Sequence, residues 1–372
     1  MEAGAEGARF GEAAGLLEEG VREKAYQAAV LLAARGETVL FQEAAGAASL
    51  SSVFDIASLT KPLVATLFFL LAQQGRISPE DRPAEQLPFR SPDPEAGRIT
   101  YLQLLSHTSG LPAYRPLYEG LREEGERQGC RIHGTSEGHD RILEAVLAMP
   151  LSFPPGSGWA YSDLGYMLLG RAIELCAFSS LDRLLRKEVA LPLGMRDTGY
   201  LPLSSLSECE TGRIVSTGRS SVRGIEKVGE VDDENAAAMG GVAGHAGVFS
   251  TAHDLFLFSR EMLRARRGEG RVLSRASALR MTERVTTPAG CPRTPGWDSP
   301  TSDTEGGSQA GGQFSPNTVG HLGFSGCSFW IDLDREATVV LLTNRVYYGQ
   351  DNGRLKALRP RIHDAVLAAM DG

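Results

Sequence analysis

Residues 54–62 read Phe-Asp-Ile-Ala-Ser-Leu-Thr-Lys-Pro, and an almost wholly apolar run follows them to Ala72. Residues three apart lie on one face of a helix, so a helix that begins near Ser58 brings the Lys61 amine beside the Ser58 hydroxyl. A serine hydroxyl is a poor nucleophile until a neighbour takes its proton, and burial lowers the pKa of a lysine toward the range where it can do so. The stretch therefore predicts a nucleophilic serine with a lysine as its base.

The alternative is that Ser58 only caps a helix and that Lys61 lies on the solvated side of that helix. Two observations favour the catalytic interpretation. Ser58 is the only serine of the chain with a lysine three residues later, and the helix that Lys61 would enter is almost wholly apolar. Lysines are also few, so each is informative; they are Lys24, Lys61, Lys187, Lys227 and Lys356.

A second element lies at residues 161–166, where Tyr-Ser-Asp-Leu-Gly-Tyr follows a Pro-Pro-Gly-Ser-Gly turn and opens another apolar helix. A phenol at Tyr161 could shuttle a proton between Ser58 and a leaving group. The alternative is a tyrosine packed at a helix start, with Asp163 in the first turn, where an acidic side chain is favourable. On these residues alone the structural interpretation is the better one.

A third element, Gly-His-Leu-Gly-Phe-Ser-Gly at residues 320–326, directly precedes an expected strand. Glycines here would let a substrate lie close against an edge strand, and exposed N–H groups could serve as an oxyanion hole. His245 has a nearly identical setting in Gly-His-Ala-Gly at residues 244–247. We therefore expect at least one of His245 and His321 to be structural.

The two ends of the chain carry matching patterns. Apolar runs at residues 26–34 and 38–43 flank a Gly-containing turn, and runs at 328–333 and 337–343 flank a second turn. Each pair predicts a β-hairpin. Residues 355–370 have apolar positions at helical spacing, so we expect the two termini to pack on one antiparallel sheet.

Residues 286–317 are rich in Pro, Gly, Ser and Thr and predict a long loop. The sequence thus predicts an α/β fold of the α+β type, in which a mainly antiparallel sheet is flanked by helices. We expect an α/β lobe of residues 1–61 and 226–372, an all-helical lobe of residues 62–225, and the active site between them. Helices are expected over residues 11–24, 58–74, 100–106, 141–149, 162–177 and 181–190.

The composition excludes several classes of function. With 372 residues, 42% of them hydrophobic and 23% charged, we expect a soluble globular protein of two lobes or domains. The formal net charge of -8 is spread along the chain without a run of Lys or Arg, so nucleic acid is not an expected partner. The longest apolar run, residues 62–72, is too short to span a bilayer.

The five cysteines are odd in number and widely separated, which argues against a disulfide framework. Residues 1–9 have neither the basic start nor the apolar core of a secretory signal, so we expect a cytoplasmic protein or one whose signal has been removed. Both remain open. One polar segment crowds Cys130, His133, His139 and Asp140, but their spacing matches no zinc pattern, and no metal site is expected.

Taken together, the three elements resemble a family of enzymes. Ser-x-x-Lys at residues 58–61, Tyr-x-Asp at 161–163 and His-x-Gly at 321–323 have the order found in class C β-lactamases, DD-peptidases and related esterases. Residues 104–112 and 240–254 also resemble the framework of that family.

The likeness covers the chain from about residue 20 onward and is greatest to a branch of penicillin-binding proteins. That branch carries Asp-Glu-Asn-Ala, here residues 233–236, and Leu-Thr-Asn-Arg, here residues 342–345. No chemical role is assigned to Asp233, Glu234 or Asn235, which would line the cleft or form a structural loop.

The resemblance implies a β-lactamase/transpeptidase-like fold and a serine hydrolase that works through an acyl-enzyme on Ser58. No metal or organic cofactor is implied, and the expected partner is a small acyl substrate: a β-lactam, a D-Ala peptide or an ester. The implied residues are Ser58, Lys61, Tyr161 and His321 for catalysis, Ser58 and Phe324 for the oxyanion hole, and Asp163 and Gly323 for substrate binding.

Two departures from the family pattern leave the substrate class open. Many members have Asn where this chain has Asp163, and a carboxylate near Lys61 would favour the charged amine, so that Tyr161 would act more as the base. β-Lactamases have Lys where this chain has His321, and a neutral histidine binds a substrate carboxylate weakly. A carboxylesterase of the same family is therefore an alternative to a β-lactamase or DD-peptidase.

The competing hypothesis from another class is a non-catalytic, penicillin-binding sensor that is acylated without turnover. All three motif positions hold residues that can take part in catalysis, which counts against the loss of catalytic activity that this hypothesis requires. The natural substrate, the oligomeric state and the fate of the acyl group, passed to water or to an amine, stay open at this stage.

Overall fold

Both chain ends contribute to one antiparallel sheet in the computed structural model, which describes residues 9–205, 212–301 and 308–372. The strand order is β2-β1-β8-β7-β6, and each neighbouring pair is antiparallel. Both predicted hairpins are confirmed, β1–β2 and β7–β8. The strands are β1 (Ala28–Arg35), β2 (Thr38–Gly46), β6 (Thr318–Leu322), β7 (Ser328–Asp332) and β8 (Ala337–Thr343).

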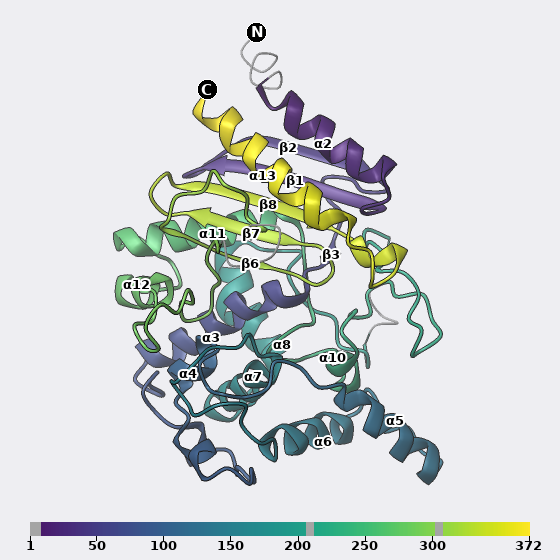
Figure 1. The fold of residues 1–372 in the computed structure, drawn as a ribbon, viewed down its shortest axis with the longest axis vertical. Coiled ribbons are helices and arrows are strands. Elements are labelled where there is room, and N and C mark those ends of the chain that lie inside the picture. The colour runs from purple at the N-terminus through teal and green to yellow at the C-terminus, as the bar shows by residue number, and fades with distance from the viewer. Residues whose placement is uncertain (1–8, 206–211, 302–307) are drawn as a thin grey trace.

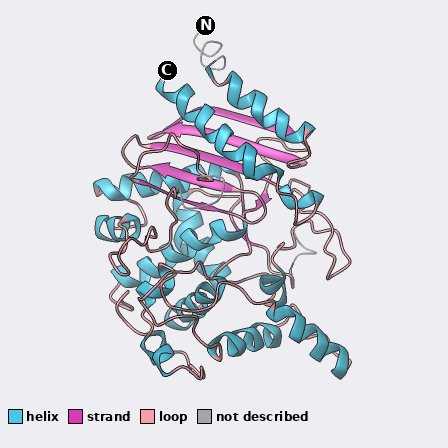
Figure 2. Ribbon diagram, in the orientation of Figure 1, coloured by secondary structure: helices cyan, strands magenta, loops and turns pink. Residues whose placement is uncertain are grey.

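The sheet has helices on both faces, as Figures 1 and 2 show. Helices α2 (Gly11–Arg22) and α13 (Arg354–Asp371) lie side by side over one face, where alternate β1 residues such as Leu31 join their apolar core. Leu32, which points the other way, joins the main core together with α11 (Ala252–Arg267). A β1 strand buried on both faces explains its unbroken apolar sequence.

The remaining helices form the part of the molecule below the sheet in Figure 1. At its centre α3 (Thr60–Gln73) is almost wholly buried, as its apolar sequence predicts. The others are α4 (Tyr101–Leu105), α5 (Leu117–Gln128), α6 (Ser136–Leu147), α7 (Asp163–Ala177), α8 (Leu181–Leu184), a π-helical segment (Leu185–Ala190), α9 (Leu191–Leu193), α10 (Glu234–Ala238), α12 (Arg275–Thr282) and the short 3-10 helices η1 (Ala57–Leu59), η2 (Pro83–Glu85), η3 (Pro94–Arg98) and η6 (Arg345–Tyr348).

A second, three-stranded sheet was not expected from the sequence. Strand β5 (Val248–Ser250) pairs with β3 (Phe54–Asp55) on one side and with β4 (Gly199–Tyr200) on the other. β4 lies within the range expected to be helical. Strands of two or three residues leave no alternation to recognise, because the side-chain period of a strand is itself two residues.

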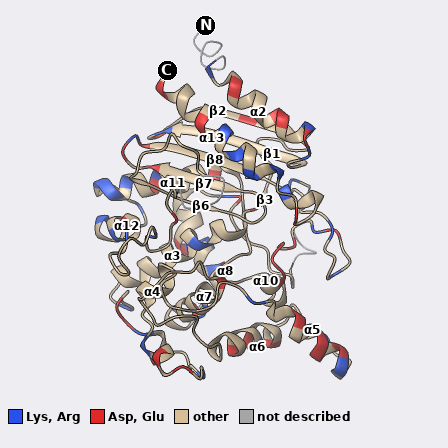
Figure 3. Cartoon of the chain, viewed as in Figure 1, with Lys and Arg blue, Asp and Glu red and all other residues tan. Residues whose placement is uncertain are grey.

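Charged residues of both signs are distributed over the described chain (Figure 3), in line with the absence of a Lys- or Arg-rich run. Within the described residues no single helix is both long and apolar enough to cross a membrane, and only the bent pair of residues 163–177 and 181–193 meets these criteria together.

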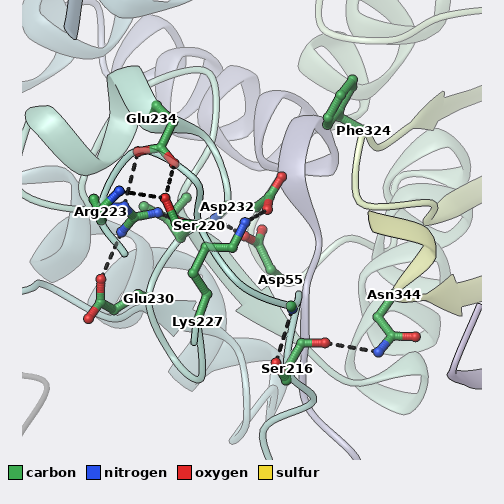
Figure 4. Close-up of polar contacts among 12 residues, drawn as sticks. Asp55, Ser216, Ser220, Arg223, Lys227, Glu230, Asp232, Glu234, Phe324 and Asn344 are labelled. Carbon is green, nitrogen blue, oxygen red and sulfur yellow. Dashed lines mark hydrogen bonds and ion pairs between the residues drawn. The ribbon is translucent and has the colours of Figure 1, made fainter. Parts of the chain in front are cut away.

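Asn344, directly after β8, ties the two chain ends to a loop. Its side-chain oxygen accepts the N–H groups of Gln27, at 3.0 Å, and Ala28, at 2.8 Å, and its amide nitrogen donates to the Ser216 carbonyl at 2.9 Å (Figure 4). Asn344 is 1% exposed, so water cannot replace its side chain as the partner of these backbone groups.

We predict that Asn344→Ala lowers the free energy of unfolding by about 2–4 kcal/mol, because it leaves buried donors unpaired at the start of β1. Urea denaturation followed by circular dichroism measures the change. Asn317→Ala is the matched control, since the Asn317 side chain is exposed and bonds only Asp334, and we expect it to cost less than about 0.5 kcal/mol. Equal losses in the two variants would contradict this assignment.

Candidate active site

A strained turn presents Ser58 at the start of the buried helix α3. Strand β3 ends at Asp55, and Ala57 then adopts a left-handed conformation with a φ of 48°, which is unfavourable for a residue with a Cβ. The Asp55 carboxylate accepts the Ala57 N–H at 2.8 Å and holds this turn. Ser58 follows within η1, directly before the N-terminus of α3, where the helix dipole favours negative charge.

Lys61 is fully buried, so the interpretation that it lies on a solvated helix face is wrong. Its Nζ contacts the Ser58 Oγ at 2.9 Å, the Asp163 Oδ1 at 2.7 Å and the His245 carbonyl oxygen at 3.0 Å. Burial lowers the pKa of Lys61 below its ordinary value and outweighs Asp163, which acts to raise it. Asp163 does favour the charged amine, as expected, but burial has the larger effect, so the pKa of Lys61 is lowered on balance.

Tyr161 lies directly before α7, with its ring against the amine. The Lys61 Nζ is 4.8 Å from the centre of the Tyr161 ring, and the centre of the His107 ring is 4.6 Å from the same point. Burial, with Asp163, raises the pKa of Tyr161 well above its ordinary value, although a hydrogen bond with Ser58 lowers it in part. The Tyr161 phenol therefore stays protonated at neutral pH and can donate a proton, whereas Lys61, whose pKa is lowered, is the group of the two that loses its proton more readily.

His321, on β6, is 3% exposed and neutral. Its Nδ1 contacts the carbonyl oxygen of Leu322 at 2.8 Å, and burial together with the nearby Lys61 lowers the pKa of His321 to about 3. A histidine that stays neutral throughout the physiological range provides no fixed positive charge for a substrate carboxylate.

Gly323 and Phe324 follow β6 and meet the turn that carries Ser58. A Cβ at Gly323 would lie 2.8 Å from the carbonyl oxygen of Ile56, so only glycine permits this approach. Within the described residues, neither the Ser58 N–H nor the Phe324 N–H donates to a protein acceptor. Two unused donors beside a nucleophile are what an oxyanion hole requires.

The predicted site residues converge on one cavity of about 600 Å³. Lys61 lies beneath it and reaches it through Ser58 and Asp163. The cavity lining includes Ser58, Tyr161, Asp163, His321, Gly323 and Phe324, which are all the other residues that the sequence singled out for the site.

Sequence reasoning missed Arg293 and Asp298, which the loop of residues 286–317 places in the cavity wall. The Arg293 guanidinium lies 5.5 Å from the centre of the Tyr161 ring, and its Nη1 is 2.8 Å from the Asp298 Oδ1. Its Nε has no hydrogen-bond partner in the described structure. Neither residue has periodicity or a motif around it, so no signal in the sequence could have found them.

His107 and His245 support the site from behind. The His107 Nδ1 accepts the Ser162 N–H at 3.0 Å, which fixes the residue that follows Tyr161. His245 binds the Asp233 Oδ1 through its Nε2 at 3.0 Å, while its backbone carbonyl contacts the Lys61 amine. Of the two similar His-Gly segments, the one with His245 thus supplies a backbone contact to Lys61.

Asp233 and Glu234 of the Asp-Glu-Asn segment line another wall of the cavity, and the three residues of the segment have separate contacts. Asp233 caps α10 by accepting the Ala236 N–H at 2.7 Å. The Glu234 carboxylate lies 3.0 Å from the Arg223 Nε, as Figure 4 shows. Asn235 is fully buried and its amide nitrogen donates to a backbone carbonyl, so it is structural.

No group of three or more His, Cys, Asp or Glu side chains in the described ranges is arranged to hold a metal ion. Cys130 and Asp140 are exposed, on either side of the start of α6 and apart from the cavity.

We predict that Asp163→Asn moves the acid limb of the pH profile of kcat/KM for p-nitrophenyl acetate to lower pH, by about one unit. A lysine that acts as the base must be neutral, and Asp163 raises the pKa of Lys61, so removing the Asp163 charge would leave more neutral amine at low pH. Asp140→Asn, at an exposed carboxylate, is the control and should leave the profile unchanged. A limb that stays in place or moves upward would argue against Lys61 as the base.

Comparisons with known proteins agree with this geometry. The model of the Beta-lactamase family matches residues 13–362. A protein of Escherichia coli (strain K12) named "Putative D-alanyl-D-alanine carboxypeptidase" is 32% identical over 323 residues, which cover 80% of this chain and 70% of that protein.

Solved structures share the fold. EstCE1, described as a hydrolase with promiscuous acyltransferase activity, superposes with a TM-score of 0.71 at 23% identity and covers 98% of this chain and 99% of its own. A D-stereospecific amidohydrolase from Streptomyces sp. has a TM-score of 0.67 at 20% identity, with 90% of this chain and 93% of its own covered. The predicted fold class and family resemblance are confirmed: this chain belongs to the Beta-lactamase family.

Proposed function

We propose that this protein is a serine hydrolase that forms an acyl-enzyme on Ser58. The observation that carries the proposal is the buried Lys61 amine, 2.9 Å from the Ser58 Oγ and with a pKa below its ordinary value. Beside them lie a protonated phenol, Tyr161, and two unused backbone donors facing the same cavity. Nucleophile, base, acid and oxyanion donors are thus all present among the residues of the chain.

The reaction follows from these positions. The neutral Lys61 amine takes the Ser58 proton as the Oγ attacks the substrate carbonyl carbon, and the N–H groups of Ser58 and Phe324 stabilise the oxyanion. When the intermediate collapses, Tyr161 gives its proton to the leaving group and regains one from the Lys61 ammonium. Water then attacks the acyl-enzyme by the reverse sequence, which releases the acid and restores Ser58.

For the substrate we propose an amide or peptide that ends in a carboxylate, as in D-alanyl-D-alanine peptides. Arg293 supports this, because its guanidinium lines the cavity next to Tyr161, which gives its proton to the leaving group. His321 is neutral and donates its Nδ1–H to the Leu322 carbonyl, so it would contribute the lone pair of Nε2 rather than charge. The name of the Escherichia coli relative points to the same substrate class.

We also propose that residues 1–61 and 226–372 act as an α/β lobe and residues 62–225 as a helical lobe around the cavity. The residues that line the cavity come from both ranges: Ser58 and His321 from the first, and Tyr161 and Asp163 from the second. The two ranges would then each supply part of one site, with Tyr161 of the helical lobe hydrogen-bonded to Ser58 of the α/β lobe.

We predict that Ser58→Ala abolishes covalent labelling by a fluorescent penicillin and lowers p-nitrophenyl acetate turnover at least about 1,000-fold. Intact-mass spectrometry and absorbance assays measure the two effects. Ser51→Ala, at an exposed serine seven residues earlier, is the control and should behave as wild type. Unchanged turnover in Ser58→Ala would exclude Ser58 as the nucleophile, while a stable wild-type adduct without any turnover would support the sensor hypothesis.

We predict that Arg293→Leu raises KM for a D-alanyl-D-alanine peptide about 10- to 100-fold, because a charge-assisted contact to the terminal carboxylate is lost. KM for p-nitrophenyl acetate, which has no such carboxylate, should change less than about twofold. Arg280→Leu, at a surface arginine, should alter neither value. Equal changes for both substrates, or activity confined to the ester, would favour the carboxylesterase alternative.

A further inference from the structure

Asp55 joins two distant segments behind the nucleophile. Its Oδ1 accepts the Ala57 N–H at 2.8 Å and its Oδ2 accepts the Asp232 N–H at 2.7 Å, across 177 residues of sequence. The residue is 1% exposed. Figure 4 shows Asp55, Asp232 and Lys227 as one cluster.

The first contact bears on the nucleophile. Ala57 is in the left-handed region, which costs about 1–3 kcal/mol for a non-glycine residue and persists only when neighbouring groups hold it. The peptide between Ala57 and Ser58 carries the N–H that we assign to the oxyanion hole. A rotation of that peptide would move the Ser58 Oγ and this donor together, and displacements of about 1 Å can cost 100-fold in rate.

The second contact bears on the base. The segment that Asp55 holds at Asp232 continues to Asp233, which binds the His245 side chain at 3.0 Å. The carbonyl of His245 in turn accepts a hydrogen bond from the Lys61 amine. Asp55 therefore touches the backbone on which Ser58 depends and, through two further contacts, the acceptor that fixes Lys61.

Burial of the charged groups of Asp55, Asp232 and Lys227 lowers the stability of the folded protein. The Lys227 amine forms an ion pair with Asp232, whereas the buried Asp55 carboxyl group, next to that pair, binds backbone N–H groups only. Burial, with the neighbouring Asp232, raises the pKa of Asp55 to about 7. A carboxyl group whose pKa is raised on folding favours the folded state at low pH, and this contribution is lost as the pH rises through about 7. The ionised form thus opposes stability under the conditions in which the site would work.

We propose that Asp55 is a positioning residue, whose ionised carboxylate fixes the turn of Ser58 and the segment behind Lys61 by binding the Ala57 and Asp232 N–H groups together. This inference rests on the proposed acyl-transfer function and adds a group that does not touch the substrate. The two carboxylate oxygens accept both backbone N–H groups at once, whereas the amide of an asparagine at this position has one acceptor oxygen and would turn an NH2 group toward the other donor.

The test compares Asp55→Asn with Asp332→Asn. Asp332 is also fully buried and also accepts backbone N–H groups, from Ser315, Asp334 and Arg335, but it lies at the end of β7 and does not line the cavity. For p-nitrophenyl acetate we expect Asp55→Asn to lower kcat about 30- to 100-fold with KM changed less than threefold. Asp332→Asn should change thermal stability while leaving kcat per folded molecule within about twofold.

The pH dependence separates positioning from a merely structural role. Both proteins contain Lys61, so the fall in kcat at low pH that is due to Lys61 is the same in each. Dividing the wild-type kcat by the Asp55→Asn kcat at each pH removes this shared effect. We expect this ratio to be large above pH 7 and to fall toward one below it, as the Asp55 carboxylate is protonated. The charged or titratable groups that face Asp55 are Asp232, Asp233, Lys227 and Cys327.

A second variant keeps the test decisive if Asp55→Asn does not fold. Lys227→Met leaves the Asp232 charge without its ion-pair partner, and Asp232 raises the pKa of Asp55, so Asp55 should hold its proton to higher pH and the acid limb of kcat should move upward by about one unit. A kcat for Asp55→Asn within twofold of wild type, a ratio independent of pH, or an unmoved limb in Lys227→Met would overturn the proposal. If Ser58→Ala were also fully active, the proposed function itself would fail; if only Ser58→Ala were inactive, the positioning role alone would fail.

Discussion

The burial of one amine is the constraint on which the site depends. Removing an ammonium from water is expensive unless its hydrogens find acceptors, and three separate segments supply acceptors to Lys61. They are the Ser58 hydroxyl on η1, the Asp163 carboxylate at the start of α7, and a carbonyl at His245 before β5. Because all three must meet at one nitrogen, helices α3 and α7 and the loop before β5 have one relative arrangement that satisfies the amine. That same arrangement places the nucleophile.

Burial also determines which groups around the cavity carry charge. The two histidines nearest Tyr161, His107 and His321, have pKa values lowered by burial and by the cations around them, so both stay neutral. Arg293 places a guanidinium in the cavity wall beside Tyr161, where its Nη1 is paired with Asp298. Burial raises the pKa of Asp298 above its ordinary value. In the proposed reaction, a substrate carboxylate would therefore be bound by Arg293, which lies in a loop. His321 of the His-x-Gly motif is neutral and would not supply this charge.

The parts of this structure that the sequence could predict are the ones encoded locally. Ser58 and Lys61 are three residues apart on one helix, and the hairpins β1–β2 and β7–β8 each pair adjacent runs, so a short window contains the whole signal. Arg293 reaches the cavity from an aperiodic loop, and Asp55 meets Asp232 across 177 residues. Such contacts depend on the path of the chain between them, which no local pattern records. The order of the three motifs places Ser58, Tyr161 and His321 in one site although they are far apart in the sequence. It does so only because a known family has the same order.

The two His-Gly segments show why similar sequences here have different roles. A Cβ at Gly244 would lie 1.9 Å from the Tyr166 carbonyl, so glycine there allows the loop of His245 to press against α7 and bring its carbonyl to Lys61. At Gly323 the obstacle would be the Ile56 carbonyl at 2.8 Å, on the turn that leads to Ser58. In both places a glycine lies against a backbone carbonyl, and this contact sets the distance between the two segments. Backbone atoms can move aside far less than the end of a flexible side chain can. The spacing of the two proposed oxyanion donors therefore follows from main-chain contact, and side-chain differences such as His321 can alter substrate preference without moving those donors.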